Sequence, residues 1–210
     1  MIKLLVVGGG GHAKVIIDIA RCCGGFELTG VLDDRASLLG RMVAGVPVIG
    51  TVDQLVELSP GFGGAIVAVG DNPTRRALTG RVVATGLPLT SLIHPRACVA
   101  ASVRLGPGCV IMAGAVVNCD VVIGDGCIVN TGATIDHDCE IGAWAHVGPG
   151  AVLCGDISVG EESLIGVGAR IIPRITIGAR AVVGAGAVVV RNVSDGEKVV
   201  GVPARTIGSG

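Results

Sequence analysis

The sequence predicts two domains in series: a small α/β domain with a parallel sheet, followed by a three-sided β-helix of parallel strands. An aliphatic residue stands at every sixth position from Ile93 to Val189 without a break. Half of the residues are hydrophobic, yet only 1% are aromatic and 36 are glycine. A core of small aliphatic side chains with frequent glycine turns favours many short strands.

A second set of residues fixes the size of one coil of the repeat. The residues two positions before each aliphatic are small (Ala, Cys or Ser), except for Val103, Val121, Ile157 and Ile175. These four exceptions lie 18, 36 and 18 residues apart, so they align if three six-residue units make one coil. The sequence therefore predicts a prism with 18 residues per coil, stacked at about 4.8 Å.

The first 90 residues read as alternating strands and helices. Strands are expected over residues 2–7, 28–32 and 65–69, with helices over 13–22 and from about 73 to 84. Gly8, Gly10 and Ala13 satisfy G-x-G-x-x-[G/A], in which glycine lets the backbone approach a phosphate at a helix N-terminus. Because this segment has room for only half of a dinucleotide fold, it favours a nucleotide sugar over NAD.

Charge and cysteine usage restrict the partners. The net charge is −1 and no long basic run occurs, so neither a nucleic acid nor a membrane surface is expected as a partner. The apolar runs are too short for a membrane span or a secretory signal. The eight cysteines include several in the repeat, which fits buried thiols of a cytoplasmic protein. No CxxC pair suggests a metal site, and with only His137 and His146 in the repeat, a zinc site of three histidines is disfavoured.

Seven motifs in a fixed order resemble one known family. They are GGGGHAK (8–14), LDD (32–34), VGDN (69–72), IHP (93–95), VNTGATIDHDC (129–139), HVGPGA (146–151) and GVPAR (201–205). Together they resemble the NeuD/PglD-like sugar acetyltransferases, which include bacillosamine and perosamine N-acetyltransferases and sialic acid O-acetyltransferases. The resemblance implies a nucleotide-sugar-binding domain over residues 1–90 and a left-handed β-helix acetyltransferase domain with a C-terminal tail over 91–210. It also implies a homotrimer with its sites between subunits.

The same resemblance implies the reaction. We expect an acetyl-CoA-dependent enzyme that acetylates the amino group of a UDP- or GDP-linked 4-amino-4,6-dideoxyhexose for bacterial surface glycan or O-antigen synthesis. Acetylation of a sugar hydroxyl, as in the sialic acid branch, is the alternative. The sequence leaves open both the nucleotide base and the identity of the amino sugar, because a glycine loop reads phosphate through the backbone.

An amine must lose its proton before it attacks a thioester, and a neutral imidazole can accept that proton. His137 and His146 both fall on outward positions of the repeat. The resemblance assigns the general base to His137 and its supporting acid to Asp138, while Asp136 remains a rival partner. His146 resembles a residue that contacts acetyl-CoA near the thioester. Since it lies half a coil from His137, the two can share a site only across a subunit boundary.

The remaining site residues are implied by resemblance alone. Gly10, Gly11 and His12 would approach the sugar nucleotide, Asp33, Asp34 and Gly70 would surround its base and ribose, Asn130 would contact the substrate, and Gly155, Gly166, Val167 and Ala185 would line the pantetheine groove. His12 could instead cap the helix, and Asn130 could instead stabilise a turn through its side-chain amide. No cysteine is placed for an acyl-enzyme, so we expect direct transfer.

Overall fold

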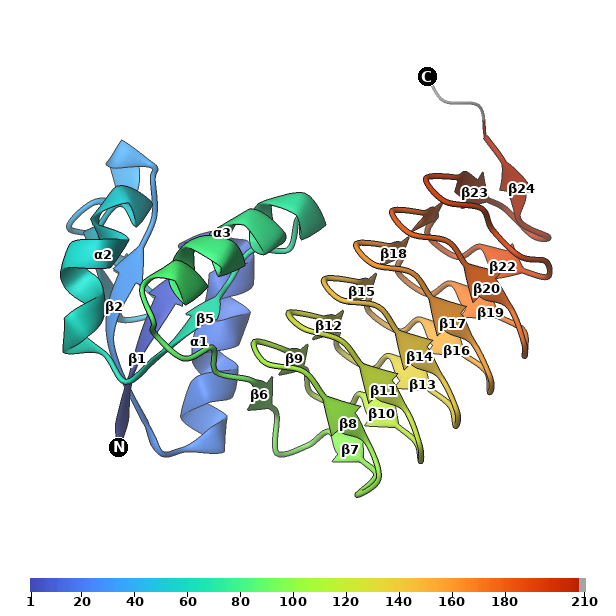
Figure 1. Ribbon diagram of the computed structural model, residues 1–210, viewed down its shortest axis with the longest axis horizontal. Helices are drawn as coiled ribbons and strands as arrows, with labels where there is room; N and C mark the ends of the chain where they lie inside the picture. Colours follow the sequence, from blue (N-terminus) through green and yellow to red (C-terminus); the bar gives the residue numbers. More distant parts are fainter. Residues whose placement is uncertain (208–210) are drawn as a thin grey trace. The chain divides into compact units, whose positions relative to one another are not determined.

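The computed structural model describes residues 1–207, and its contacts divide the chain into two compact units, Met1–Pro95 and the segment from Arg96 onward. Figure 1 shows helices only in the first unit and a regular stack of short strands in the second. Within the described residues no helix is both long and apolar enough to cross a membrane. Each unit is described below by itself.

The first unit is built on a five-stranded sheet with the order β3-β4-β2-β1-β5. Its strands are β1 (Ile2–Val7), β2 (Phe26–Leu32), β3 (Met42–Val43), β4 (Val46–Gly50) and β5 (Gly64–Val67); its helices are α1 (Gly11–Cys23), α2 (Leu55–Leu58) and α3 (Asn72–Ala84), with 3₁₀ turns η1 (Ala36–Leu38), η2 (Val52–Gln54) and η3 (Ser59–Gly61) and a short strand β6 (Leu92–Ile93). All neighbours in the sheet are parallel except β3 and β4, which form a hairpin.

The sheet places the glycine loop at its switch point. The central strand β1 pairs with β2 on one side and with β5 on the other. The loops that follow β1 and β5 therefore leave the same edge in different directions, which is where α/β sheets bind ligands. The loops also touch: a Cβ built on Gly8, whose φ is +103°, would lie 2.7 Å from Cγ2 of Val69. Only glycine allows this approach.

The second unit is a left-handed β-helix of three sheets, as predicted, and its strands pair in parallel except for the last pair, which is antiparallel. One sheet contains β7 (Cys98–Val99), β10 (Val116–Val117), β13 (Thr134–Ile135), β16 (Val152–Leu153), β19 (Arg170–Ile171) and β22 (Val188–Val189); the second contains β8 (Arg104–Leu105), β11 (Val122–Ile123), β14 (Glu140–Ile141), β17 (Ser158–Val159) and β20 (Thr176–Ile177); the third includes β9 (Val110–Ile111), β12 (Ile128–Val129), β15 (His146–Val147), β18 (Leu164–Ile165), β21 (Val182–Val183), β23 (Lys198–Val200) and β24 (Arg205–Thr206). The pairings, such as Val116 with Thr134 and Ile128 with His146, confirm the 18-residue coil.

The inward positions form the core of the prism. The repeat's aliphatic residues from Ile111 to Val189 are buried, together with the small residues two positions before them. The prediction of an inward aliphatic residue is wrong at the first position of the repeat, because Ile93 is 42% exposed. Ile93 precedes the first complete coil, so no interior has yet formed around it.

One corner of the prism turns through left-handed residues. Asp120, Asp138, Asp156 and Arg174 stand one above the other at 18-residue spacing, with φ of 59°, 58°, 59° and 62°. Aspartate tolerates this conformation better than most residues because its short polar side chain can hydrogen-bond locally. This corner carries His137.

Candidate active site

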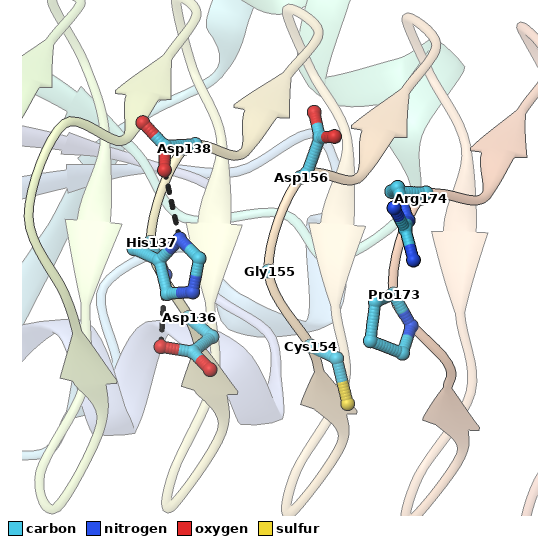
Figure 2. Close-up of a pocket in the computed structure, with 8 residues that line it drawn as sticks. All are labelled: Asp136, His137, Asp138, Cys154, Gly155, Asp156, Pro173 and Arg174. Atoms are coloured by element: carbon cyan, nitrogen blue, oxygen red, sulfur yellow. Dashed lines mark hydrogen bonds and ion pairs between the residues drawn. The ribbon is translucent and has the colours of Figure 1, made fainter.

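His137 lies in the corner between β13 and β14, and the turn brings Asp138 back to it. The Nδ1 atom of His137 is 2.8 Å from Oδ2 of Asp138. Neighbours on an extended strand would point to opposite faces, and the left-handed φ of Asp138 provides the bend that this contact needs. Figure 2 shows the two side chains turned toward each other.

This contact fixes the tautomer of the imidazole. An ionised carboxylate only accepts hydrogen bonds, so Nδ1–H of neutral His137 donates to Asp138 and Nε2 carries the lone pair. The pKa of His137 is raised, first by the hydrogen bond to Asp138 and then by the charge of Asp136. The arrangement is that of a general base with Nε2 as its accepting atom.

Asp136, the rival partner, makes different contacts. Its Oδ1 accepts hydrogen bonds from the backbone N–H of His137 at 2.9 Å and from Nδ2 of Asn118 at 2.7 Å. The hydrogen bond from Asn118 is the largest cause that lowers the pKa of Asp136. The imidazole ring therefore pairs with Asp138, while Asp136 acts on the backbone and through its charge.

Gly155 forms the floor under the imidazole. A Cβ built on Gly155 would lie 2.6 Å from Cε1 and 2.7 Å from Nε2 of His137. Gly155, which was predicted to line the pantetheine groove, thus lies against the imidazole of His137. Around them is a pocket of about 670 Å³, whose lining is drawn in Figure 2: Asp136, His137, Asp138, Cys154, Gly155, Asp156, Pro173 and Arg174.

The other predicted residues of the repeat gather on a different side of the prism. His146 lies on β15, and its Nε2 is 3.0 Å from Nδ2 of Asn130. Because Oδ1 of Asn130 accepts from Thr131 N–H at 2.8 Å, the Asn130 amide donates to His146, which leaves the imidazole proton on Nδ1. Asn130 thus contacts the other predicted histidine, and neither residue lines the His137 pocket.

Gly166, Val167 and Ala185 follow β18 and β21 in the same sheet as His146. Gly166 packs closely on the next coil, since a Cβ there would lie 2.7 Å from the backbone nitrogen of Ala185. Val167 is 53% exposed, which is unusual for a valine in this repeat. These residues offer exposed apolar surface and backbone groups beside His146, as a pantetheine chain would require.

In the first unit, the N-terminus of α1 is left open. Gly10 is the N-cap, no side chain caps the helix, and its first turn holds no acidic residue. Burial, followed by the charge of Arg75, lowers the pKa of His12 to about 4, so this imidazole is neutral at neutral pH. Among the described residues, no group hydrogen-bonds to its buried Nε2 atom. His12 therefore does not cap α1 with its side chain.

The two aspartates after β2 are already engaged. Asp33 accepts from the backbone N–H of Gly9 at 2.6 Å and from the guanidinium of Arg35 at 2.8 and 2.9 Å. These contacts, with the Arg35 hydrogen bond foremost, lower the pKa of Asp33 to about 2. Asp34 accepts from the backbone N–H of Val52 at 2.8 Å. Asp33 thus holds the glycine loop after β1, and Asp34 holds the turn after β4.

Sequence reasoning missed several residues at these sites. Arg75 is only 1% exposed, and its Nη1 donates to the carbonyl oxygen of Gly70 at 3.0 Å, which fixes the loop after β5. Asp156 and Arg174 line the His137 pocket, and steps of 18 residues from Asp138 would have found both. Within residues 1–207, no group of three or more His, Cys, Asp or Glu side chains is placed to hold a metal ion.

Known proteins match both units. Residues 3–82 match the family described as the PglD N-terminal domain, and residues 120–155 match the bacterial transferase hexapeptide family. A UDP-N-acetylbacillosamine N-acetyltransferase of Bacillus subtilis (strain 168) is 40% identical over 116 residues, which are 54% of this chain and 52% of that protein. The match thus spans about half the length of this curated relative.

Two solved structures match along nearly the whole chain. PerB from Caulobacter crescentus, in complex with CoA and GDP-perosamine, is 46% identical over 98% of this chain and 97% of its own, with a TM-score of 0.92. The acetyltransferase domain of PglB from Neisseria gonorrhoeae FA1090, in complex with acetyl coenzyme A, is 46% identical over 98% of both chains, with a TM-score of 0.93. The chain belongs to the NeuD/PglD-like family of hexapeptide-repeat sugar acetyltransferases.

Proposed function

We propose that this chain transfers the acetyl group of acetyl-CoA to the amino group of a nucleotide-linked 4-amino-4,6-dideoxyhexose. The observation that carries the proposal is the His137–Asp138 pair, which leaves Nε2 of His137 as a proton acceptor at the edge of a pocket. The perosamine and bacillosamine N-acetyltransferases among the relatives support an amino sugar as acceptor.

In the proposed reaction, the sugar amine attacks in its neutral form, and Nε2 of His137 takes one proton from the amine nitrogen as it attacks. The amine nitrogen forms a bond to the thioester carbonyl carbon, and the resulting oxyanion is stabilised by a donor such as Nδ1–H of His146. The C–S bond then breaks, and the CoA thiolate takes the proton from the His137 imidazolium. The products are the N-acetyl sugar nucleotide and CoA.

The two units divide the binding tasks in this proposal. The open N-terminus of α1, with Gly10, Gly11 and His12, holds the diphosphate, and the loops of Asp33, Asp34 and Gly70 enclose the nucleoside. Gly166, Val167 and Ala185 contact the pantetheine chain. We further propose a homotrimer that shares each site between two copies. It would work in the cytoplasm and serve bacterial surface glycan or O-antigen synthesis.

The test is CoA release, detected as free thiol, from acetyl-CoA with a panel of UDP- and GDP-linked amino sugars. We expect turnover on one amino sugar and a loss of about 10²-fold or more in His137→Ala. Cys119→Ala, one coil earlier at the same corner position, is the matched control and should retain activity. CoA release only with sugars that offer a hydroxyl group would move the chain to the O-acetylating branch. If no sugar of the panel supported CoA release, the proposal would be refuted.

A further inference from the structure

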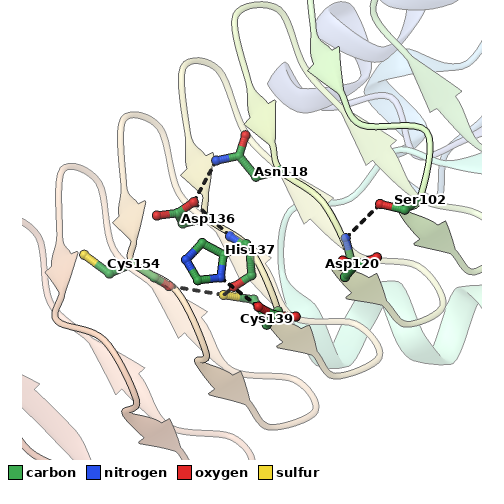
Figure 3. A network of polar contacts seen from close by, with 8 residues as sticks. Ser102, Asn118, Asp120, Asp136, His137, Cys139 and Cys154 are labelled. Carbon is green, nitrogen blue, oxygen red and sulfur yellow. Dashed lines mark hydrogen bonds and ion pairs between the residues drawn. The ribbon is translucent and has the colours of Figure 1, made fainter.

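A hydrogen-bonded chain links the coil before His137 to the backbone of this residue. Asn118 follows β10 and lies directly below Asp136, which follows β13. Nδ2 of Asn118 donates to Oδ1 of Asp136, and the same oxygen accepts the backbone N–H of His137. Figure 3 shows these two contacts in succession, from Asn118 to Asp136 and from Asp136 to His137.

The polar pair is a departure from the pattern of its column. The equivalent positions in other coils hold Ala100, Cys154, Ile172 and Val190. Stability of the coil therefore does not require an amide or a carboxylate here. Within this column, polar side chains occur only at the half-buried Asn118 and Asp136, that is, in the corner of His137 and in the same corner one coil earlier. The placement of the pair points to a role in holding the catalytic corner.

Asp136 also contributes charge to a crowded site. The carboxylates that face His137 are Asp136 from its own corner, Asp138 beside the ring and Asp156 from the next coil, and the cation of Arg174 lines the same pocket. The Asp138 side chain is held by the ring itself. Asp136 is instead held by Asn118, so the direction of its carboxylate depends on a residue outside the pocket lining.

We propose that Asn118 and Asp136 are positioning residues for His137: Asn118 orients the Asp136 carboxylate, and Asp136 fixes the backbone on which the imidazole is mounted. The proposal rests on the proposed function of His137 as the base. Removing Asn118 frees the Asp136 side chain to rotate, so His137 N–H loses a fixed acceptor. Small displacements of a catalytic group cost rate far more than they cost binding.

The first test is steady-state kinetics on the full chain. For Asn118→Ala and the nearly isosteric Asn118→Asp, we expect kcat to fall about 3- to 30-fold with KM changed less than about twofold. Ser102→Ala is the matched control, because Ser102 Oγ also accepts an inter-coil hydrogen bond in this corner, from Asp120 N–H at 2.9 Å. It should keep wild-type kcat. Wild-type kcat per folded site in both Asn118 variants would overturn the proposal.

The second test needs no turnover. The ring carbon–proton signals of the four histidines are followed by NMR against pH, and the signal missing in His137→Ala identifies His137. We expect Asp136→Asn, which keeps the acceptor oxygen but removes the charge, to lower the pKa of His137. Asn118→Ala should change the position or width of the His137 signal, whereas Ser102→Ala should not. Unchanged His137 signals in Asn118→Ala and Asp136→Asn would refute the positioning role even if the acceptor sugar were misidentified.

Discussion

At the scale of single residues, three neighbours hold His137 in place. Asp138 holds Nδ1, Asp136 holds the backbone nitrogen, and Gly155 leaves just enough space for the ring. Each neighbour controls a separate property of His137. Asp138 sets the tautomer of the ring, Asp136 sets the position of the backbone, and Gly155 sets the space between the ring and the next coil. Their substitutions should therefore have different signatures.

Replacing Asp138 should change the pH profile. The hydrogen bond to Asp138 is the largest cause that raises the pKa of His137, and the base works only when neutral. In Asp138→Asn, the pKa of His137 should fall, so the acid limb of kcat/KM against pH shifts to lower pH. The plateau should fall by about tenfold, because a less basic and less well oriented imidazole accepts the proton less effectively.

Asp120→Asn provides the control for this profile. Asp120 has the same left-handed backbone one coil earlier, and asparagine tolerates that conformation. The control should retain the wild-type limb and plateau. An unshifted acid limb in Asp138→Asn would contradict the assignment of Asp138 as the partner of the base.

Gly155 should be coupled to His137 in stability as well as in rate. A methyl group at Gly155 would overlap the imidazole, so Gly155→Ala should displace the ring and lower kcat by about tenfold or more. In the His137→Ala background the methyl group has space, and Gly155→Ala should then change the midpoint of thermal unfolding less than it does in wild type. Equal changes in the two backgrounds would show that the ring does not occupy this position.

At the scale of elements, the columns of inward residues at the corners of the prism differ in the side-chain volume that they accommodate. The inward residues Ala97, Ala115, Ala133, Ala151, Ala169 and Ala187 form one column made only of alanine. A second column holds Val103, Val121, Cys139, Ile157 and Ile175. Because stacked coils repeat the same backbone, side-chain volume at a corner is set by the column and not by the single coil.

The column rule predicts unequal effects for the same new side chain. Ala133→Val places two extra carbons between Ala115 and Ala151 in a fully buried position, and should lower the free energy of unfolding by about 1–3 kcal/mol. Cys139→Val joins Val121 and Ile157 in the larger column and should cost less than about 1.5 kcal/mol. Denaturant unfolding measures both, and equal costs would show that the columns do not differ in capacity.

Elements differed in how far the sequence could predict them. The prism could be predicted because its aliphatic residues recur every six positions along a continuous stretch of the chain. The strand β1 and the helices α1 and α3 could be predicted because their boundaries are clear in the sequence. The hairpin of β3 and β4 was missed because its strands are short and Pro47 and Gly45 interrupt the pattern. The contacts of Asp33 with Arg35, and of Asp136 with Asn118, depend on side-chain directions that no periodicity encodes.

At the scale of the whole molecule, the β-helix separates residues that the proposed reaction uses together. His137 lies at the corner after β13, whereas His146 and Asn130 lie in the sheet of β12 and β15. The pocket around His137 contains neither of them. If both histidines act on one thioester, the second must come from another copy, and a cyclic trimer would build three equivalent sites of this kind.

This requirement predicts complementation between two inactive variants. His137→Ala and His146→Ala should each have little activity alone. When the two are co-expressed with different tags and the mixed assemblies are isolated through both tags, some sites combine His137 of one copy with His146 of its neighbour. Every doubly tagged cyclic trimer contains about one intact site in three, so activity should rise well above that of either parent. Light scattering should give three times the chain mass, and doubly tagged assemblies no more active than the parents would mean that each copy builds its site alone.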